Sequence, residues 1–279
     1  MRGVVKCLAV PFLLLCAQPV CAQTASGAYV EKKLFSDDPG PEIKVSLPLS
    51  HAAALRKDDA EGALDGEGGI WVLLSDNIVD PMAMAGGVFP PVRRMAKAGV
   101  FRGILFVIKP AERDRLVVTA LYNRPDEPGN FATQTISNNQ GVWKSLTVTP
   151  TRVTGAYDDG AGMAFSFDAP IAENPITQDL RGPAALASPL ADIVIRHARA
   201  FQAGDFEALK ALESHDSWKE SEAMSPEQRA AMVRFARADP DAAKQLKITR
   251  VTIRGRTAIV QTEGGNQSLV LEDGGWKVD

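Results

Sequence analysis

The sequence has little cysteine, and its three cysteines, Cys7, Cys16 and Cys21, all lie within the first 21 of 279 residues. The rest of the chain therefore has no thiol for a disulfide, a nucleophile or a cysteine-bound metal. Histidine is equally scarce, with three residues, and the chain contains neither an HExxH motif nor a zinc-binding spacing. We therefore expect no metal centre and no cofactor.

Several other classes of function lack their sequence signals. No P-loop, dinucleotide-binding glycine pattern or GxSxG motif is present. The net charge of −3 is a poor electrostatic match for nucleic acid or an anionic membrane surface. Beyond the first residues, no apolar run approaches the roughly 20 residues of a membrane helix. We expect a chain that neither binds nucleic acid nor spans a membrane.

The first 22 residues have the pattern of an export signal. Arg2 and Lys6 give a basic start, residues 8–17 are apolar but too few to span a bilayer, and small residues precede Ala22. The pattern predicts cleavage after Ala22, and the cysteines do not fit a lipid-attachment motif. An exported, soluble protein without disulfides indicates a bacterial periplasm.

Residues 27–171 are predicted to be mostly β-strand, with one helix at 91–98 that has proline in its first turn and Gly99 as its stop. Arg93, Arg94 and Lys97 give this helix a basic face that is typical of solvent exposure. Pro150 predicts that the strand before it lies at an edge or holds a bulge. The expected strands are 42–47, 70–74, 103–108, 116–122, 143–149 and 163–167. This composition favours a β-rich, sandwich-like domain.

A proline-rich segment, residues 172–187, shows little periodicity and is predicted to be a semi-extended linker. It would separate the β-rich domain from a second domain at 188–279.

Three helices are predicted next. Ser188 caps the first, which Gly204 ends, and Asp205 caps the second. The third begins with a capping-box spacing at 225–228. We expect Met232, Phe235 and Ala236 of this third helix to be buried.

The remaining sequence predicts an antiparallel meander. Its strands are expected at 247–253, 257–262, 268–271 and 276–278, separated by glycine-containing turns. Helices followed by a run of antiparallel strands make an α+β domain, and the whole chain is expected to be α+β.

The order of helices and then a meander that closes on Glu272-Asp273-Gly274-Gly275-Trp276-Lys277-Val278-Asp279 resembles small exported members of the nuclear transport factor 2-like superfamily, also described as cystatin-like. The resemblance covers about residues 190–279. It implies a bent sheet wrapped around helices to make a cone with an apolar pocket. Members of this superfamily include isomerases, dehydratases and binding modules.

In such a cone, His197 on the apolar face of the first helix is a candidate base, although a half-buried structural histidine is the favoured interpretation. His215, expected in a turn after the second helix, is a weaker candidate that could pair with it. Phe201, Phe235 and Trp276 are candidates to line the pocket. The three tyrosines all precede residue 158, so the resembled isomerase mechanism lacks its oxyanion donor in this region.

We therefore expect an exported, non-enzymatic binding or scaffold protein, with a small apolar ligand or an envelope protein as its partner. The alternative is an enzyme of the dehydratase or isomerase type with His197 as base. An open pocket at His197 with an acidic group in hydrogen-bond reach would favour the enzyme. A pocket filled by Phe201, Phe235 and Trp276 would exclude it.

Overall fold

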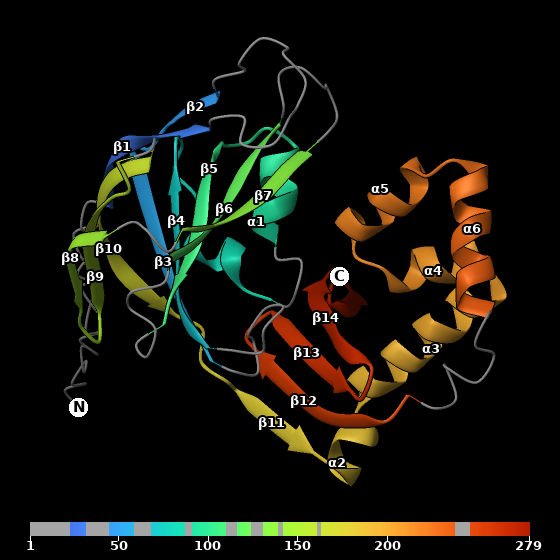
Figure 1. Cartoon of the computed structure of the whole chain (residues 1–279). Coiled ribbons are helices and arrows are strands. Elements are labelled where there is room, and N and C mark those ends of the chain that lie inside the picture. The colour runs from blue at the N-terminus through green and yellow to red at the C-terminus, as the bar shows by residue number, and fades with distance from the viewer. Residues whose placement is uncertain are drawn as a thin grey trace, which may run out of the picture.

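The computed structural model describes residues 23–31, 45–58, 68–86, 91–109, 116–123, 131–138, 142–160, 163–237 and 246–279. Its strands form two sheets, one in the N-terminal part (residues 23–173) and one in the C-terminal part (residues 178–279) (Figure 1). Helices accompany both sheets, so the α+β prediction is confirmed. The predicted leader and all three cysteines lie outside the described residues.

The described N-terminal part holds a ten-stranded sheet with the order β2-β1-β10-β3-β4-β5-β6-β7, to which β9 and then β8 are joined through β10. The elements are β1 (Thr24–Glu31), β2 (Val45–Pro48), β3 (His51–Lys57), β4 (Gly69–Ser75), the 3-10 helix η1 (Pro81–Met84), α1 (Pro91–Lys97), β5 (Gly103–Ile108), β6 (Leu116–Asn123), β7 (Phe131–Asn138), β8 (Val142–Val148), β9 (Arg152–Asp158) and β10 (Met163–Glu173).

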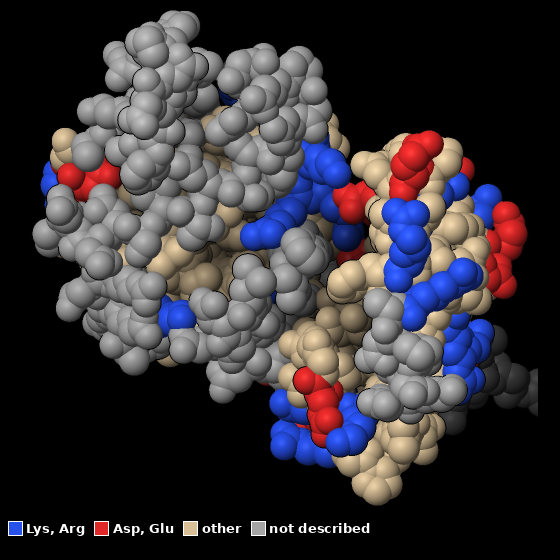
Figure 2. Space-filling view, turned by 45° about the vertical axis from the view of Figure 1, so that its right-hand side comes forward, with Lys and Arg blue, Asp and Glu red and all other residues tan. Residues whose placement is uncertain are grey.

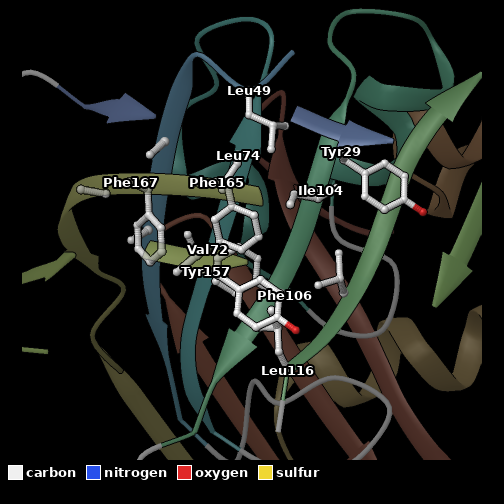
Figure 3. Close-up of a cluster of buried hydrophobic side chains, with 14 of the residues drawn as sticks. Tyr29, Leu49, Val72, Leu74, Ile104, Phe106, Leu116, Tyr157, Phe165 and Phe167 are labelled. Carbon is white, nitrogen blue, oxygen red and sulfur yellow. The ribbon is translucent and has the colours of Figure 1, made fainter. Parts of the chain in front are cut away.

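Strand β10 connects two layers of this sheet. Its residues 163–170 pair antiparallel with β1 and β9, whereas residues 171–173 pair parallel with β3. One hydrophobic cluster takes side chains from both layers. Figure 3 shows Tyr157 and Phe165 of one layer beside Phe106 of the other, and the rings of Phe106 and Phe165 are 5.5 Å apart.

The central strands of the N-terminal part are covered on both faces. In β4, Ile70, Val72 and Leu74 belong to the cluster shared by the two layers, while Trp71 and Leu73 belong to a second cluster with α1 and η1. Because neither face meets solvent, β4 is a continuous apolar run rather than an alternating pattern. The helix α1 is thereby fixed to one face of the sheet.

A buried lysine also holds η1 against this face. The Nζ atom of Lys57 donates hydrogen bonds of 2.9 Å to the carbonyl oxygens of Met84 and Gly86. It also lies 3.8 Å from the centre of the Trp71 ring. Burial of an ammonium group requires such partners, so Lys57 is a structural residue here.

The C-terminal part is an antiparallel sheet in sequence order, β11 to β15, with helices before and beside it. Its elements are β11 (Gln178–Arg181), α2 (Pro183–Leu186), α3 (Pro189–Ala203), α4 (Phe206–Leu212), α5 (His215–Ala223), α6 (Pro226–Arg237), β12 (Ile248–Arg254), β13 (Thr257–Thr262), β14 (Gly265–Glu272) and β15 (Gly275–Val278). Apolar residues of α2 and α3 pack on β12–β14.

Most predicted elements are present. The strands expected at 70–74, 103–108, 116–122, 143–149 and 163–167 appear as β4, β5, β6, β8 and β10, and the helix at 91–98 as α1. Of the strand expected at 42–47, residues 42–44 lie outside the described residues and 45–47 belong to β2.

Among the described strands β8 pairs with β9 alone, in agreement with an edge strand before Pro150. The Ser188 and Asp205 caps are confirmed, since their side chains accept hydrogen bonds from backbone N–H groups of α3 and α4.

The segment 172–187 is not a semi-extended linker throughout. It holds the end of β10, the strand β11 and the helix α2. Strand β11 pairs with β12, and Asp179 binds Arg250 through hydrogen bonds of 2.7 and 2.9 Å. Proline at the first turn of α2 begins a helix rather than a loop. The high proline content concealed both elements.

Two predictions about the helices were wrong. His215 begins the helix α5 rather than lying in a turn, because Ser214 caps that helix by accepting from the Ser217 N–H group. The expected burial of α6 is not found: Phe235 is 84% exposed, Met232 and Ala236 are half-buried, and no residue of α6 is buried. α6 packs on α3 and does not lie on the sheet.

We predict that Phe106→Ala destabilises the protein by about 3–5 kcal/mol, because it leaves a cavity among Trp143, Phe165 and Phe167. Phe235→Ala is the matched control and should change the free energy of unfolding by less than about 0.5 kcal/mol. Urea denaturation measures both values. Similar losses for the two variants would contradict the assignment of Phe235 to the surface.

The ion pair that attaches β11 predicts that the free energy of unfolding depends on pH in the acid range. A hydrogen bond from Arg250 and a weaker contribution from Arg181 lower the pKa of Asp179 from 3.8 to about 2. A lowered folded-state pKa stabilises the protein above the unfolded value and loses that contribution as pH falls through the folded value. The free energy of unfolding should therefore fall between pH 3.8 and about 2, and fall less in Asp179→Asn. An identical acid profile for both proteins would show that this ion pair does not hold β11.

Candidate functional site

The N-terminal and C-terminal parts meet mainly through polar contacts. Among the described residues, each hydrophobic cluster belongs to one part alone. Charged side chains connect the parts: Arg94 binds Asp279, Lys97 binds Glu220, and Arg254 binds Asp58. Figure 2 shows basic and acidic side chains side by side where the parts meet. The relative placement of the parts therefore rests on ion pairs rather than on a shared apolar core.

The most enclosed of the helix contacts between the parts is that of Arg94 in α1 with Asp279. Both carboxylate oxygens of Asp279 lie 2.8 Å from Nη2 of Arg94, and the two side chains are 18% and 9% exposed. Oδ1 of Asp279 also accepts a hydrogen bond of 2.7 Å from Ser214, the residue that caps α5. One carboxylate thus connects α1, the residue after β15 and the start of α5. Shielding from water makes such charge-assisted bonds stronger than those of exposed pairs.

A groove of about 820 Å³ lies between α1 and α5 beside this pair. Apolar side chains contribute much of its lining, while the pair of Lys97 and Glu220, 3.5 Å apart, lies at its side. Its apolar lining residues are Pro91, Met95, Ala98, Val100, Ala223 and Met224. The groove needs both parts of the molecule, because α1 supplies one wall and α5 the other.

The candidate base His197 has an acidic neighbour. Its Nε2 atom lies 3.2 Å from Oε1 of Glu213, and its ring is stacked on Phe201 with the ring centres 6.4 Å apart. The other oxygen of the buried Glu213 accepts a hydrogen bond of 3.0 Å from Ser221. These bonds tie α3, the end of α4 and α5 to one another.

This arrangement meets one half of the condition for an enzyme. The acidic group is within hydrogen-bond reach of His197, but His197 does not line the groove between α1 and α5. Ser221 is bonded to the carboxylate and not to the imidazole, so the order of a Ser-His-Asp triad is absent. The contacts fit the interpretation of a half-buried structural histidine.

The other predicted site residues do not gather at one place. His215 is 73% exposed at the start of α5 and faces Glu272 and Asp273 of the β14–β15 turn, so its partners differ from those of His197. Phe201 packs among α3 and α4, and Trp276 packs against the cluster on the sheet. With Phe235 on the surface, the predicted pocket of Phe201, Phe235 and Trp276 is not formed.

Sequence reasoning missed the residues that build the groove. The sequence predicts Arg94 on a solvated face of α1, but Arg94 is largely buried against Asp279, 185 positions along the chain. No local pattern links residues so far apart. The polar sequence of α5 also hid a helix, and the cap at Ser214 was the one local signal for it.

Further observations limit the chemistry of the described residues. No group of three or more His, Cys, Asp and Glu side chains in this part of the chain is placed to hold a metal ion. Every helix among the described residues is too short or too polar to cross a membrane. Comparison with models of protein families, with curated proteins and with solved structures found no match for this chain.

We predict that Arg94→Met lowers the free energy of unfolding by about 3 kcal/mol, because it leaves the shielded Asp279 carboxylate without its cation. Arg102→Met removes a more exposed pair with Asp76 and should cost less than about 1 kcal/mol. Chemical denaturation of the two variants makes the comparison. Equal, small losses would contradict the role given to Arg94.

Proposed function

We propose that this protein is an exported, non-enzymatic binding protein whose ligand site is the groove between α1 and α5. The observation that carries the proposal is the groove itself: about 820 Å³ with a largely apolar lining, at the meeting of two parts of one chain. Ligand sites in proteins commonly have volumes of about 300–1,000 Å³ and lie between domains.

The lining favours a small apolar ligand. Met95 and Met224 lie in it, and methionine side chains adapt to irregular apolar shapes. The charged residues of the groove have both signs and are paired, as in Lys97 with Glu220 and Arg94 with Asp216. Counting the adjacent Asp279, three carboxylates balance the three cations of the groove, so the attraction rests on apolar contact. An envelope protein that inserts an apolar side chain is the other binding role.

The proposed organisation is a sandwich-like domain at 27–171 and a nuclear transport factor 2-like domain at 188–279, brought to the periplasm by the leader at 1–22. The shared cluster between the two layers joined by β10 supports the first assignment. Helices followed by an antiparallel meander support the second. The groove would then lie between two domains rather than inside the cone.

The alternative proposal is a dehydratase or isomerase with His197 as base. The contact of His197 with Glu213 favours it, since a carboxylate can orient an imidazole for proton transfer. Its substrate would have to reach His197 beside Phe201, away from the groove. The binding proposal does not need His197, and the two proposals therefore assign ligand contact to different residues.

We predict that the neutral fluorescent probe N-phenyl-1-naphthylamine binds the wild-type protein and that Ala98→Trp weakens this binding by at least about tenfold, because the indole fills the groove. Ala211→Trp, at an exposed position of α4, is the matched control and should leave the affinity unchanged. Fluorescence titration gives the dissociation constants.

The proposal fails if Ala98→Trp binds the probe as tightly as the wild type. Loss of binding in His197→Gln with retention in Ala98→Trp would instead favour the enzyme alternative. Native mass spectrometry of the protein purified from a periplasmic extract then identifies the natural ligand or partner by its mass.

A further inference from the structure

We propose a second binding site, an arginine-rich groove between α3 and α6 that takes an acidic, amphipathic peptide segment of a partner protein. Two adjoining hollows of about 530 and 340 Å³ lie here and share Ala203 and Arg237. Together they follow the face of α6 that turns toward α3. This groove is separate from the one between α1 and α5, with which it shares no lining residue.

Two arginines form fixed walls of the groove. Arg237 donates hydrogen bonds of 2.9 and 2.7 Å to the carbonyl oxygens of Gln202 and Ala203 at the end of α3. Arg229 donates to the carbonyl oxygen of Glu222, and its guanidinium lies 5.4 Å from the centre of the Phe206 ring. These contacts set the shape of the groove before any ligand binds.

Two further arginines add positive charge to the groove. Arg199 lines the smaller hollow and Arg234 the larger one, and both side chains are exposed. Among the described residues neither forms an ion pair or a hydrogen bond, in contrast to Arg196, which binds Asp192. The chain as a whole is acidic, with a net charge of −3, so this local positive charge opposes the overall sign. Figure 2 shows basic side chains over the helices of the C-terminal part, with acidic side chains beside some of them.

The floor between these charges is apolar. Phe206, Val233 and Ala230 lie in the larger hollow between the arginines. An occupant therefore needs apolar side chains along its centre and carboxylates at its edges. Guanidinium groups bind carboxylates through paired, charge-assisted hydrogen bonds, and arginine is enriched where proteins bind one another.

The geometry favours a peptide segment over the other anionic occupants. The hollows are open to solvent along α6, whose 12 residues extend over about 18 Å, so a small ligand would stay largely exposed. A membrane surface would have to engage the exposed Phe235 together with the arginines. Phe235 follows Val233 by two residues, which places it about 200° around the helix, on the opposite face.

The test uses a fluorescein-labelled synthetic helix of about 16 residues with leucine on one face and glutamate at the other positions, and the same peptide with glutamine for glutamate. Fluorescence anisotropy should show saturable binding of the acidic peptide to the full chain, weakened by salt. Arg199→Glu with Arg234→Glu should weaken it by at least about tenfold. Lys247→Glu with Arg256→Glu makes the same change in net charge on the sheet and should have little effect.

Four results would overturn the proposal. They are no binding of the acidic peptide, equal binding of the neutral peptide, equal binding by the Arg199 and Arg234 double variant, and binding to phosphatidylglycerol vesicles without binding to the peptide. Circular dichroism reports whether each variant is folded. If the double glutamate variant does not fold, Arg199→Gln with Arg234→Gln replaces it, with the same expected direction.

Discussion

The shielded pair of Arg94 and Asp279 is the contact on which the proposed arrangement of this molecule depends. The two parts have separate apolar cores, and among the described residues no hydrophobic cluster joins them. The Asp279 carboxylate binds Arg94 of α1 and Ser214 at the start of α5. Since α1 and α5 form the two walls of the groove, the same carboxylate sets their spacing. The placement of the two parts and the shape of the groove thus depend on the same charged contact.

Local chemistry in the sequence was sufficient to predict most of the fold. Ser188, Gly204 and Asp205 mark helix ends through hydrogen bonds within a few residues, and the meander follows from alternating strands and glycine turns. Where the structure departs from the prediction, contacts between residues distant in sequence determine which element forms and which of its side chains are buried. Asp179 is fixed in β11 by Arg250. The predicted capping box at the start of α6 is formed, since Ser225 and Gln228 exchange hydrogen bonds between side chain and backbone, but α6 does not bury Phe235.

The candidate sites were far less predictable, because their residues are distant in sequence. No sequence pattern links Arg94 with Asp279, and Met95 and Met224 line the same groove only because of how the two helices are placed. The sequence marks His197 as a titratable group on an apolar face, and His197 does have an acidic partner in Glu213. The residue type alone could not reveal that the contact of His197 with Glu213 holds helices together, or that His197 does not line the groove.

The most direct test measures the distance across the groove. Spin labels at cysteines introduced for Ala98 and Ala223, with the three native cysteines replaced by serine, report the separation of α1 and α5 by double electron–electron resonance. We expect one narrow distance distribution, which Arg94→Met broadens and shifts while Arg102→Met leaves it unchanged. A distribution that is already broad without either substitution, or one that Arg94→Met does not alter, would contradict the account.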